Sequence, residues 1–183
     1  MDRIANPLDW GPVSLVRRNH GLEHATLNLL GELYPKQPFA GYSDTKGFWI
    51  VGDISTDVLF SVVNQALDRL RGGERSLAIH ANCGTNFVTA GVVAGTAAWL
   101  YTLGSANTFK KKVTRWSSLV MLITGSLIVA RPLGPKVQEK ITTSGDPLDL
   151  AVSQITRYER RGPALHRIRT TVPAASTQVS LEE

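Results

Sequence analysis

Apolar residues recur at helical spacing in two stretches of the first half of the chain. Residues 14–33 carry apolar side chains mainly three or four positions apart, and the pattern stops before Pro35. Residues 55–71 repeat this spacing, after a Ser-Thr pair suited to an N-cap and before Gly72. Both patterns are typical of amphipathic helices with recognisable ends, so we expect a helix in each stretch.

Strand-type patterns separate and follow these helices. Residues 39–53 contain turn-forming residues and then the β-rich run 48–51, which predicts a short hairpin. Residues 77–79 predict a third, short strand. The order helix, hairpin, helix, strand predicts a small α+β domain over residues 14–85, preceded by an N-terminal extension of residues 1–13.

Two long apolar runs come next. Residues 86–109 contain no charged residue and are long enough to cross about 30 Å of hydrocarbon as a helix. Residues 116–130 are shorter and would span only if the flanking Arg115 and Arg131 reach to the headgroups. We therefore expect a transmembrane helical hairpin over residues 86–131, and the alternative is two buried helices of a soluble core.

Residue types within the runs favour the membrane interpretation. Trp99, Tyr101 and Trp116 lie near the ends of the runs, where aromatic side chains are enriched in membrane proteins. Gly91 and Gly95 form a GxxxG step that lets another helix approach closely. The lipid bilayer is thus the expected partner, with a membrane protein as a further partner through the GxxxG hairpin.

The last part of the chain is more polar. Residues 148–158 have the spacing of an amphipathic helix, so residues 132–161 are predicted to form a C-terminal amphipathic helix region. Residues 162–183 are rich in Thr, Ser, Ala and Pro and are predicted to be a disordered tail. His166 falls in this tail and is expected to be solvated and without a role.

The charge distribution sharpens this division. The averages, 43% apolar and 19% charged residues, fit one ordinary globular domain and exclude a many-span membrane chain. Of the net charge of +5, residues 1–85 contribute eight Lys or Arg against nine acids, whereas residues 86–130 hold four Lys or Arg and no acid. These basic residues are not interleaved with aromatic side chains, so no nucleic-acid partner is expected.

A metal-binding motif stands on the first predicted helix. His20 and His24 are four positions apart and share one helical face, with Glu23 beside them, in the pattern H-x-x-E-H. This is the inverted form of the zincin motif, in which the two histidines hold a metal ion and the glutamate acts as general base on a metal-bound water. Paired histidines on an amphipathic helix also occur without a metal.

A second string raises the expectation of a metal site. His80 and Cys83 form H-x-x-C just before the first apolar run, and Cys83 is the single cysteine of the chain. Zn²⁺ accepts both imidazole and thiolate, so His20, His24, His80 and Cys83 would form a His₃Cys zinc site. The alternative is a buried strand end with an inert thiol.

The combined strings resemble a known family. H-G-L-E-H-A-T at residues 20–26, H-A-N-C-G-T-N-F at 80–87 before the apolar hairpin, R-P-L-G at 131–134 and I-T-T-S-G-D-P-L-D-L-A-V at 141–152 resemble the bacterial YqhQ-like family of uncharacterised membrane proteins and its shorter sister group. Members have been described as predicted metal-dependent enzymes. The resemblance implies a metal site at His20, His24, His80 and Cys83, and a place in the bacterial inner (plasma) membrane.

Two classes of function fit these expectations. The first is a membrane-anchored zinc hydrolase, peptidase-like, with Glu23 as its catalytic base. The second is a non-catalytic membrane protein with a structural His₃Cys zinc site, as an accessory subunit of a larger membrane complex. The positive-inside rule is near balance, because the loop carries four Lys or Arg and the flanks carry three on each side. The lack of an export signal and the reduced state needed by Cys83 favour a cytoplasmic domain.

Overall fold

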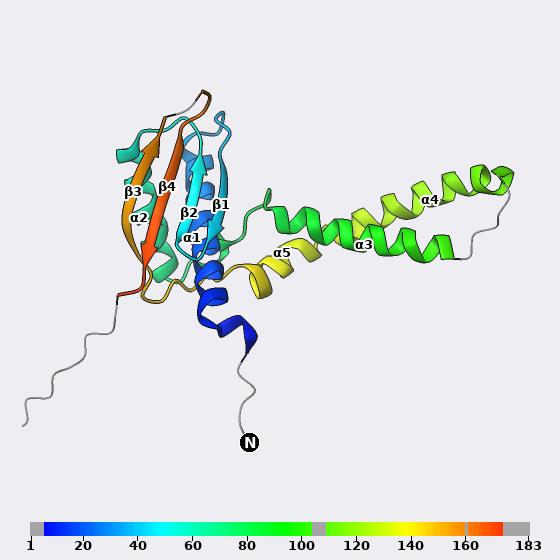
Figure 1. The fold of residues 1–183 in the computed structure, drawn as a ribbon, viewed down its shortest axis with the longest axis horizontal. Helices are drawn as coiled ribbons and strands as arrows, with labels where there is room; N and C mark the ends of the chain where they lie inside the picture. Colours follow the sequence, from blue (N-terminus) through cyan, green and yellow to red (C-terminus); the bar gives the residue numbers. More distant parts are fainter. Residues whose placement is uncertain (1–5, 104–108, 160, 174–183) are drawn as a thin grey trace, which may run out of the picture. The chain divides into compact units, whose positions relative to one another are not determined.

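The computed structural model describes residues 6–103, 109–159 and 161–173 (Figure 1). The chain divides into two compact units. The first, here called the sheet domain, combines residues 1–78 with residues 144–183. The second, here called the hairpin unit, is residues 79–143. The predicted domain of residues 14–85 is therefore completed by chain that returns after the hairpin.

The first half of the sheet domain follows the sequence pattern closely. A 3₁₀ turn, η1 (Pro7–Asp9), precedes helix α1 (Gly11–Leu33). Strands β1 (Ala40–Asp44) and β2 (Gly47–Val51) form the expected hairpin. Helix α2 (Thr56–Arg71) begins after Ser55, whose side chain accepts a hydrogen bond from the Val58 amide. Local signals, namely apolar spacing, caps and turn residues, were sufficient for these elements.

The C-terminal part differs from the prediction. Residues 148–158, expected as an amphipathic helix, instead contain strand β3 (Ala151–Tyr158). Strand β4 (Leu165–Thr171) lies within the predicted disordered tail, whose residues 174–183 are outside the described part of the chain. β-branched residues such as Val152 and Ile155 pack well on a pleated surface, and pairing with β4 selects the strand over the helix.

The four strands form one antiparallel sheet in the order β1-β2-β4-β3. The last strand of the described residues, β4 (Leu165–Thr171), thus lies in the interior of the sheet, with Ile168 opposite both Phe48 of β2 and Ile155 of β3. Both helices cover the same face of the sheet (Figure 1). The core between helices and sheet is apolar and is completely buried at Leu22, Leu30, Phe48, Ile50, Leu59, Leu150 and Ile168.

Two junctions complete the sheet domain. Residues 77–79, expected as a strand, do not form one: Leu77 and Ala78 end a 3₁₀ turn, η2 (Arg75–Ala78), which packs against α1, and Ile79 follows this turn. On returning from the hairpin unit, the Ser144 amide donates to the Arg17 carbonyl at 2.9 Å. A Cβ at Gly21 would lie 2.0 Å from the Ser144 carbonyl oxygen, so α1 needs a glycine at this crossing.

The hairpin unit contains two long helices and a bent return. Helix α3 (Gly84–Leu103) packs along helix α4 (Phe109–Ala130), and α4 is followed by α5 (Leu133–Val137) and the π-helical segment η3 (Gln138–Thr142). Among the described residues, α3 alone is a helix long and apolar enough to cross a membrane, with a mean hydropathy of 1.2. A second candidate appears if residues 115–130 and 133–142, bent by 48°, count as one span.

His166 is a buried residue of the sheet rather than a solvated one. It lies on β4 opposite Ile50 and Arg157, its side chain is completely buried, and neither ring nitrogen has a hydrogen-bond partner among the described residues. Desolvation by burial lowers the pKa of His166 below its usual value, the positive charge of Arg157 lowers this pKa further, and Glu159 opposes the shift. The neutral imidazole is therefore the form that the core accommodates.

This burial predicts a pH-dependent stability. The unfolded chain protonates His166 near pH 6.5, whereas the folded chain does so only at lower pH, so stability is complete above about pH 6.5 and falls as the pH drops below it. The loss is about 1.4 kcal/mol for each unit of pKa depression. Thermal unfolding of the full chain between pH 8 and pH 5, followed by circular dichroism, measures it. His166→Phe should remove this part of the pH dependence, and an unchanged pH dependence in this variant would contradict the assignment.

Candidate metal centre

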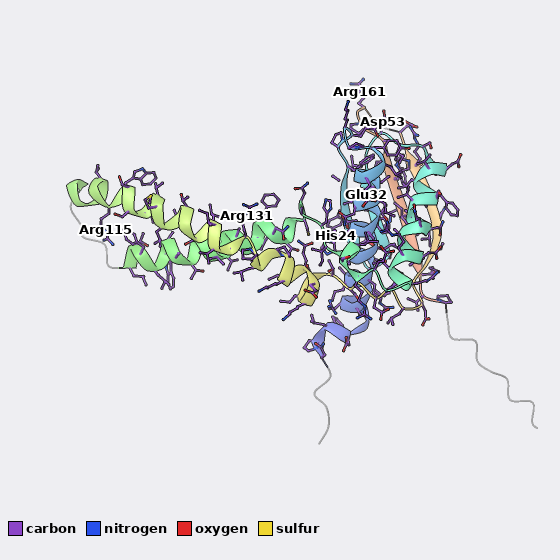
Figure 2. All side chains as sticks on the ribbon, turned by 180° about the vertical axis from the view of Figure 1, so that it is seen from behind. His24, Glu32, Asp53, Arg115, Arg131 and Arg161 are labelled. Atoms are coloured by element: carbon purple, nitrogen blue, oxygen red, sulfur yellow. The ribbon has the colours of Figure 1, made fainter. Side chains whose placement is uncertain are left out.

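Helix α1 brings its two motif histidines together. His20 and His24 are one helical turn apart, and their ring centroids are 4.2 Å from each other at an interplanar angle of 60°. His24 is buried and His20 half-buried in the sheet domain, where Figure 2 labels His24 on α1. The pair can therefore present two imidazole nitrogens to one ion, as the spacing predicted.

The tautomer of His24 is set by the backbone. Its Nδ1 lies 2.8 Å from the carbonyl oxygen of Ala78. A carbonyl only accepts, so Nδ1 carries the proton, and in the neutral ring Nε2 is the nitrogen that can act as a ligand. Metal-binding histidines commonly hold their second nitrogen in this way, because the hydrogen bond fixes the ring and raises its basicity as a ligand. The site therefore has a preoriented nitrogen ligand at Nε2 of His24.

Cys83 follows closely along the chain after Ala78, whose carbonyl contacts His24. Cys83 is five residues after Ala78 and directly precedes α3. Its Sγ accepts a hydrogen bond from the Thr85 amide at 3.4 Å. Free amides at a helix N-terminus favour negative charge, so this position supports the thiolate form that binds metals.

Three of the four predicted ligands, His20 and His24 of the sheet domain and Cys83 of the hairpin unit, form a group that could hold a metal ion. Two imidazole nitrogens and one sulfur are a donor set that suits Zn²⁺. His80 is not a member of this group, so the predicted fourth ligand is not brought to it.

Glu23 is directed toward the sheet. Its Oε2 accepts a hydrogen bond from Ser43 Oγ on β1, and a Cβ at Gly41 would lie 2.3 Å from its Oε1. Glu23 is buried and is not a member of the His-His-Cys group. The sequence pattern identified the carboxylate, but it carried no signal for Ser43 or Gly41 as its neighbours.

A second polar contact that the sequence did not reveal fixes α1 just before the motif. Asn19 is completely buried, its Nδ2 donates to the Asp44 carbonyl at 2.8 Å, and its Oδ1 accepts from Thr170 Oγ1 at 2.7 Å. One amide thus ties the helix to both β1 and β4. This holds the turn that carries His20 at a defined place over the sheet.

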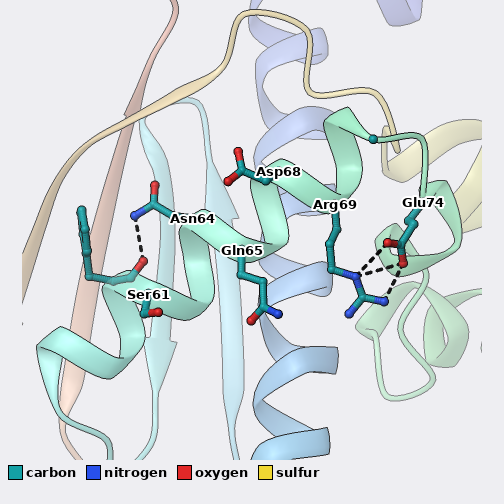
Figure 3. Close-up of a pocket in the computed structure, with 8 residues that line it drawn as sticks. Ser61, Asn64, Gln65, Asp68, Arg69 and Glu74 are labelled. Atoms are coloured by element: carbon teal, nitrogen blue, oxygen red, sulfur yellow. Dashed lines mark hydrogen bonds and ion pairs between the residues drawn. The ribbon is translucent and has the colours of Figure 1, made fainter.

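A pocket elsewhere in the molecule lacks the histidine and cysteine ligands of this group. A shallow pocket of about 700 Å³ lies along the outer face of α2, between Phe60 and Glu74 (Figure 3). The Arg69 guanidinium there is held by the Glu74 carboxylate, with Nε at 3.0 Å from both oxygens. None of the residues that line the pocket is a histidine or a cysteine.

Comparisons with known proteins give a family but no activity. A family model described as a domain of unknown function (DUF6391) matches residues 15–155. An uncharacterized protein from Picosynechococcus sp. is 36% identical over 169 residues, which cover 84% of this chain and 78% of that protein. No solved structure matches. Neither match supports the resemblance to the YqhQ-like family, and neither names a cofactor or a reaction.

The contact between Ser43 and Glu23 predicts a cost in stability. Ser43→Ala removes one donor from a buried carboxylate and should destabilise the sheet domain by about 1–3 kcal/mol. Urea unfolding followed by circular dichroism measures the change. Ser153→Ala is the matched control, because Ser153 is an exposed strand serine that donates to a backbone carbonyl. Equal effects of the two substitutions would show that the carboxylate does not depend on Ser43.

Proposed function

The chain belongs to the DUF6391 family, a domain of unknown function, and we propose that it is a membrane-anchored zinc-binding protein whose metal site serves as a hydrolase centre. The observation that carries the proposal is the group formed by His20, His24 and Cys83. Its support is the donor chemistry, the hydrogen bond that orients His24, and the helix start that favours the Cys83 thiolate.

The number of ligands favours catalysis over a purely structural site. Catalytic zinc sites keep three protein ligands and leave the fourth position to water or substrate, whereas structural sites use four. A bound zinc ion would supply a water of lowered pKa at that position. Glu23, next to His24 in sequence, is the residue proposed as general base; Ser43 donates to its carboxylate, and the lack of a side chain at Gly41 leaves room for it. The reaction class is hydrolysis of a carbonyl compound such as a peptide.

The alternative is a structural zinc ion. His24 and Cys83 are separated by 59 residues of chain, so a metal between them would close a long loop and offset the entropy of ordering it. Addition of the His80 imidazole as fourth ligand would close the shell. In that case Glu23 would only support the fold, and the protein would serve as an accessory subunit of a membrane complex.

Membrane anchoring is proposed from the surface of the hairpin unit. Both long helices keep large apolar side chains exposed, among them Phe87, Val88, Val92, Trp99, Leu100, Trp116, Met121, Ile128 and Val129. A Cβ at Gly91, Gly95 or Gly125 would meet no atom within 4 Å, so these small positions are open to another helix. We propose that the sheet domain and residue Cys83, at the start of the hairpin unit, are on the cytoplasmic side of a bacterial plasma membrane, where the thiol stays reduced.

Metal binding is tested by metal content. Purified full-length chain, saturated with Zn²⁺ and dialysed, should retain about one ion per chain by elemental analysis. His20→Ala and Cys83→Ser should each lose most of it, since each removes one ligand of the group. His80→Ala should retain it, because His80 lies outside the group. An unchanged zinc content in His20→Ala and Cys83→Ser would contradict the proposed site. Loss of zinc in His80→Ala would show that His80 is a fourth ligand and that the shell is closed and structural.

The same purified, zinc-loaded chains distinguish a catalytic zinc site from a structural one. Glu23→Gln should keep its zinc, because Glu23 is not a member of the ligand group. It should lower the turnover of a fluorogenic peptide library by about 10²–10⁴-fold, the usual contribution of a general base. A zinc-loaded wild-type chain that hydrolyses no peptide would leave the structural site as the function.

Membrane insertion is tested by a charge in α3. Val92 is near the middle of the helix and 62% exposed, and a lysine there costs about 3 kcal/mol at the centre of a bilayer. Val92→Lys should therefore move much of the chain out of the carbonate-resistant membrane fraction. Phe60→Lys is the matched control, since Phe60 is 55% exposed on α2 of the sheet domain. The same distribution of both variants would contradict insertion of α3.

A further inference from the structure

A buried amide side chain contacts the backbone just before Cys83. Gln138, the first residue of η3, is completely buried although glutamine is usually an exposed residue. Its own backbone is fixed, because the Gln138 carbonyl accepts from both the amide and the hydroxyl of Thr143 at 2.9 Å. The backbone from which the Gln138 side chain extends is therefore held in place.

The side-chain amide of Gln138 forms two hydrogen bonds with the backbone of His80. Oε1 accepts from the His80 amide at 3.0 Å, and Nε2 donates to the His80 carbonyl at 3.1 Å. Nε2 also donates to Oδ1 of Asn86 at 2.5 Å. A primary amide offers one acceptor oxygen and two N–H donors, and all of them are used here. The bidentate pairing fixes both the position and the direction of the peptide chain at His80.

Asn86 extends the same network toward the cysteine. Its Nδ2 donates to the Ala81 carbonyl at 2.7 Å, and its backbone amide donates to the Cys83 carbonyl at 3.0 Å. A Cβ at Gly134 would lie 2.4 Å from Asn86 Oδ1, so the glycine leaves the room that this side chain occupies. The side chains of Gln138 and Asn86 thus hold the backbone at His80 and Ala81, and the Asn86 backbone amide holds the Cys83 carbonyl.

We infer that Gln138 is a positioning residue for the metal centre, and that it places Cys83 Sγ by clamping the main chain at His80. The inference rests on the proposed zinc binding by His20, His24 and Cys83. It assigns a different role to the H-x-x-C string from the one its ligand-like spacing predicted, since position 80 contributes its peptide group. The clamp also joins the segment that carries Cys83 to the start of η3, because Gln138 comes directly after α5.

Co²⁺ binding distinguishes a residue that positions a metal ligand from one that binds the metal itself. Co²⁺ replaces Zn²⁺ in such sites, and a bound thiolate gives a charge-transfer absorption that reports the Co–S bond. In titrations of the purified full-length chain, Gln138→Leu should weaken Co²⁺ binding by about 10–100-fold and reduce the thiolate absorption per bound ion, which is the usual effect of losing a residue that orients a ligand. Gln138→Glu should give a smaller loss, since its carboxylate can still accept from the His80 amide.

Two controls exclude simpler explanations. Gln154→Leu makes the same chemical change at an exposed position of β3 and should leave Co²⁺ affinity and absorption unchanged. His80→Ala keeps both backbone groups that Gln138 binds and should also bind Co²⁺ like the wild type. Hydrogen exchange adds a readout for Gln138→Leu in the absence of metal, where the His80 amide should exchange faster.

The outcomes are distinguishable. A wild-type chain that binds no Co²⁺ overturns the proposed function and this inference together. Wild-type affinity and absorption in Gln138→Leu overturn the positioning role alone and leave the metal site in place. Loss of Co²⁺ binding in His80→Ala also overturns the inference, because it would make the imidazole, rather than the peptide group, the contribution of position 80. If Gln138→Leu does not fold, Gln138→Glu decides, and an unaltered Co²⁺ affinity in that variant counts against the clamp.

Discussion

The hydrogen bond between His24 Nδ1 and the Ala78 carbonyl connects the chemistry of the molecule to its fold. It fixes the ring of a motif histidine, and it also fixes the backbone at the last residue of the sheet domain before the hairpin unit begins. Asn28, one turn further along α1, donates to the neighbouring Leu77 carbonyl at 2.9 Å and supports the same attachment. The 3₁₀ turn at Arg75–Ala78 therefore replaces a strand for a physical reason: its carbonyls point at α1 side chains instead of at a neighbouring strand.

The features that the sequence predicted correctly depend on neighbours in sequence. The two helices of the sheet domain and the β1–β2 hairpin have local caps, turns and periodicity, and the i, i+4 spacing of His20 and His24 follows directly from helical geometry. The missed elements depend on distant partners. Residues 148–158 have apolar spacing compatible with a helix, and only pairing with β4 determines that they form a strand. His166 was expected to be solvated because it falls in a stretch rich in Thr, Ser, Ala and Pro, whereas its neighbours in space include Ile50.

The candidate site shows the same division. The residue types His, Glu and Cys were visible in the sequence, but the direction of each side chain was not. Glu23 points to Ser43 and Gly41 on β1, and the ring of His80 stays outside the ligand group. Contacts to backbone atoms carry no sequence signature, because a peptide group is the same at every position. Asn19 and Gln138, which bind carbonyls and amides of distant segments, were therefore beyond the reach of motif analysis.

The strand order has a consequence for the synthesis of the chain. β2 pairs with β4, and 114 residues separate Val51 from its partner Leu165. At ribosomal rates this interval lasts roughly 6–23 s, during which β2 has an unpaired inner edge and the core lacks Ile168. The α1–β1–β2–α2 segment therefore emerges as an incomplete domain, and the whole apolar hairpin is made before the missing strands arrive. Exposed strand edges are prone to pair with other chains, so this intermediate is open to such pairing until β4 joins the sheet.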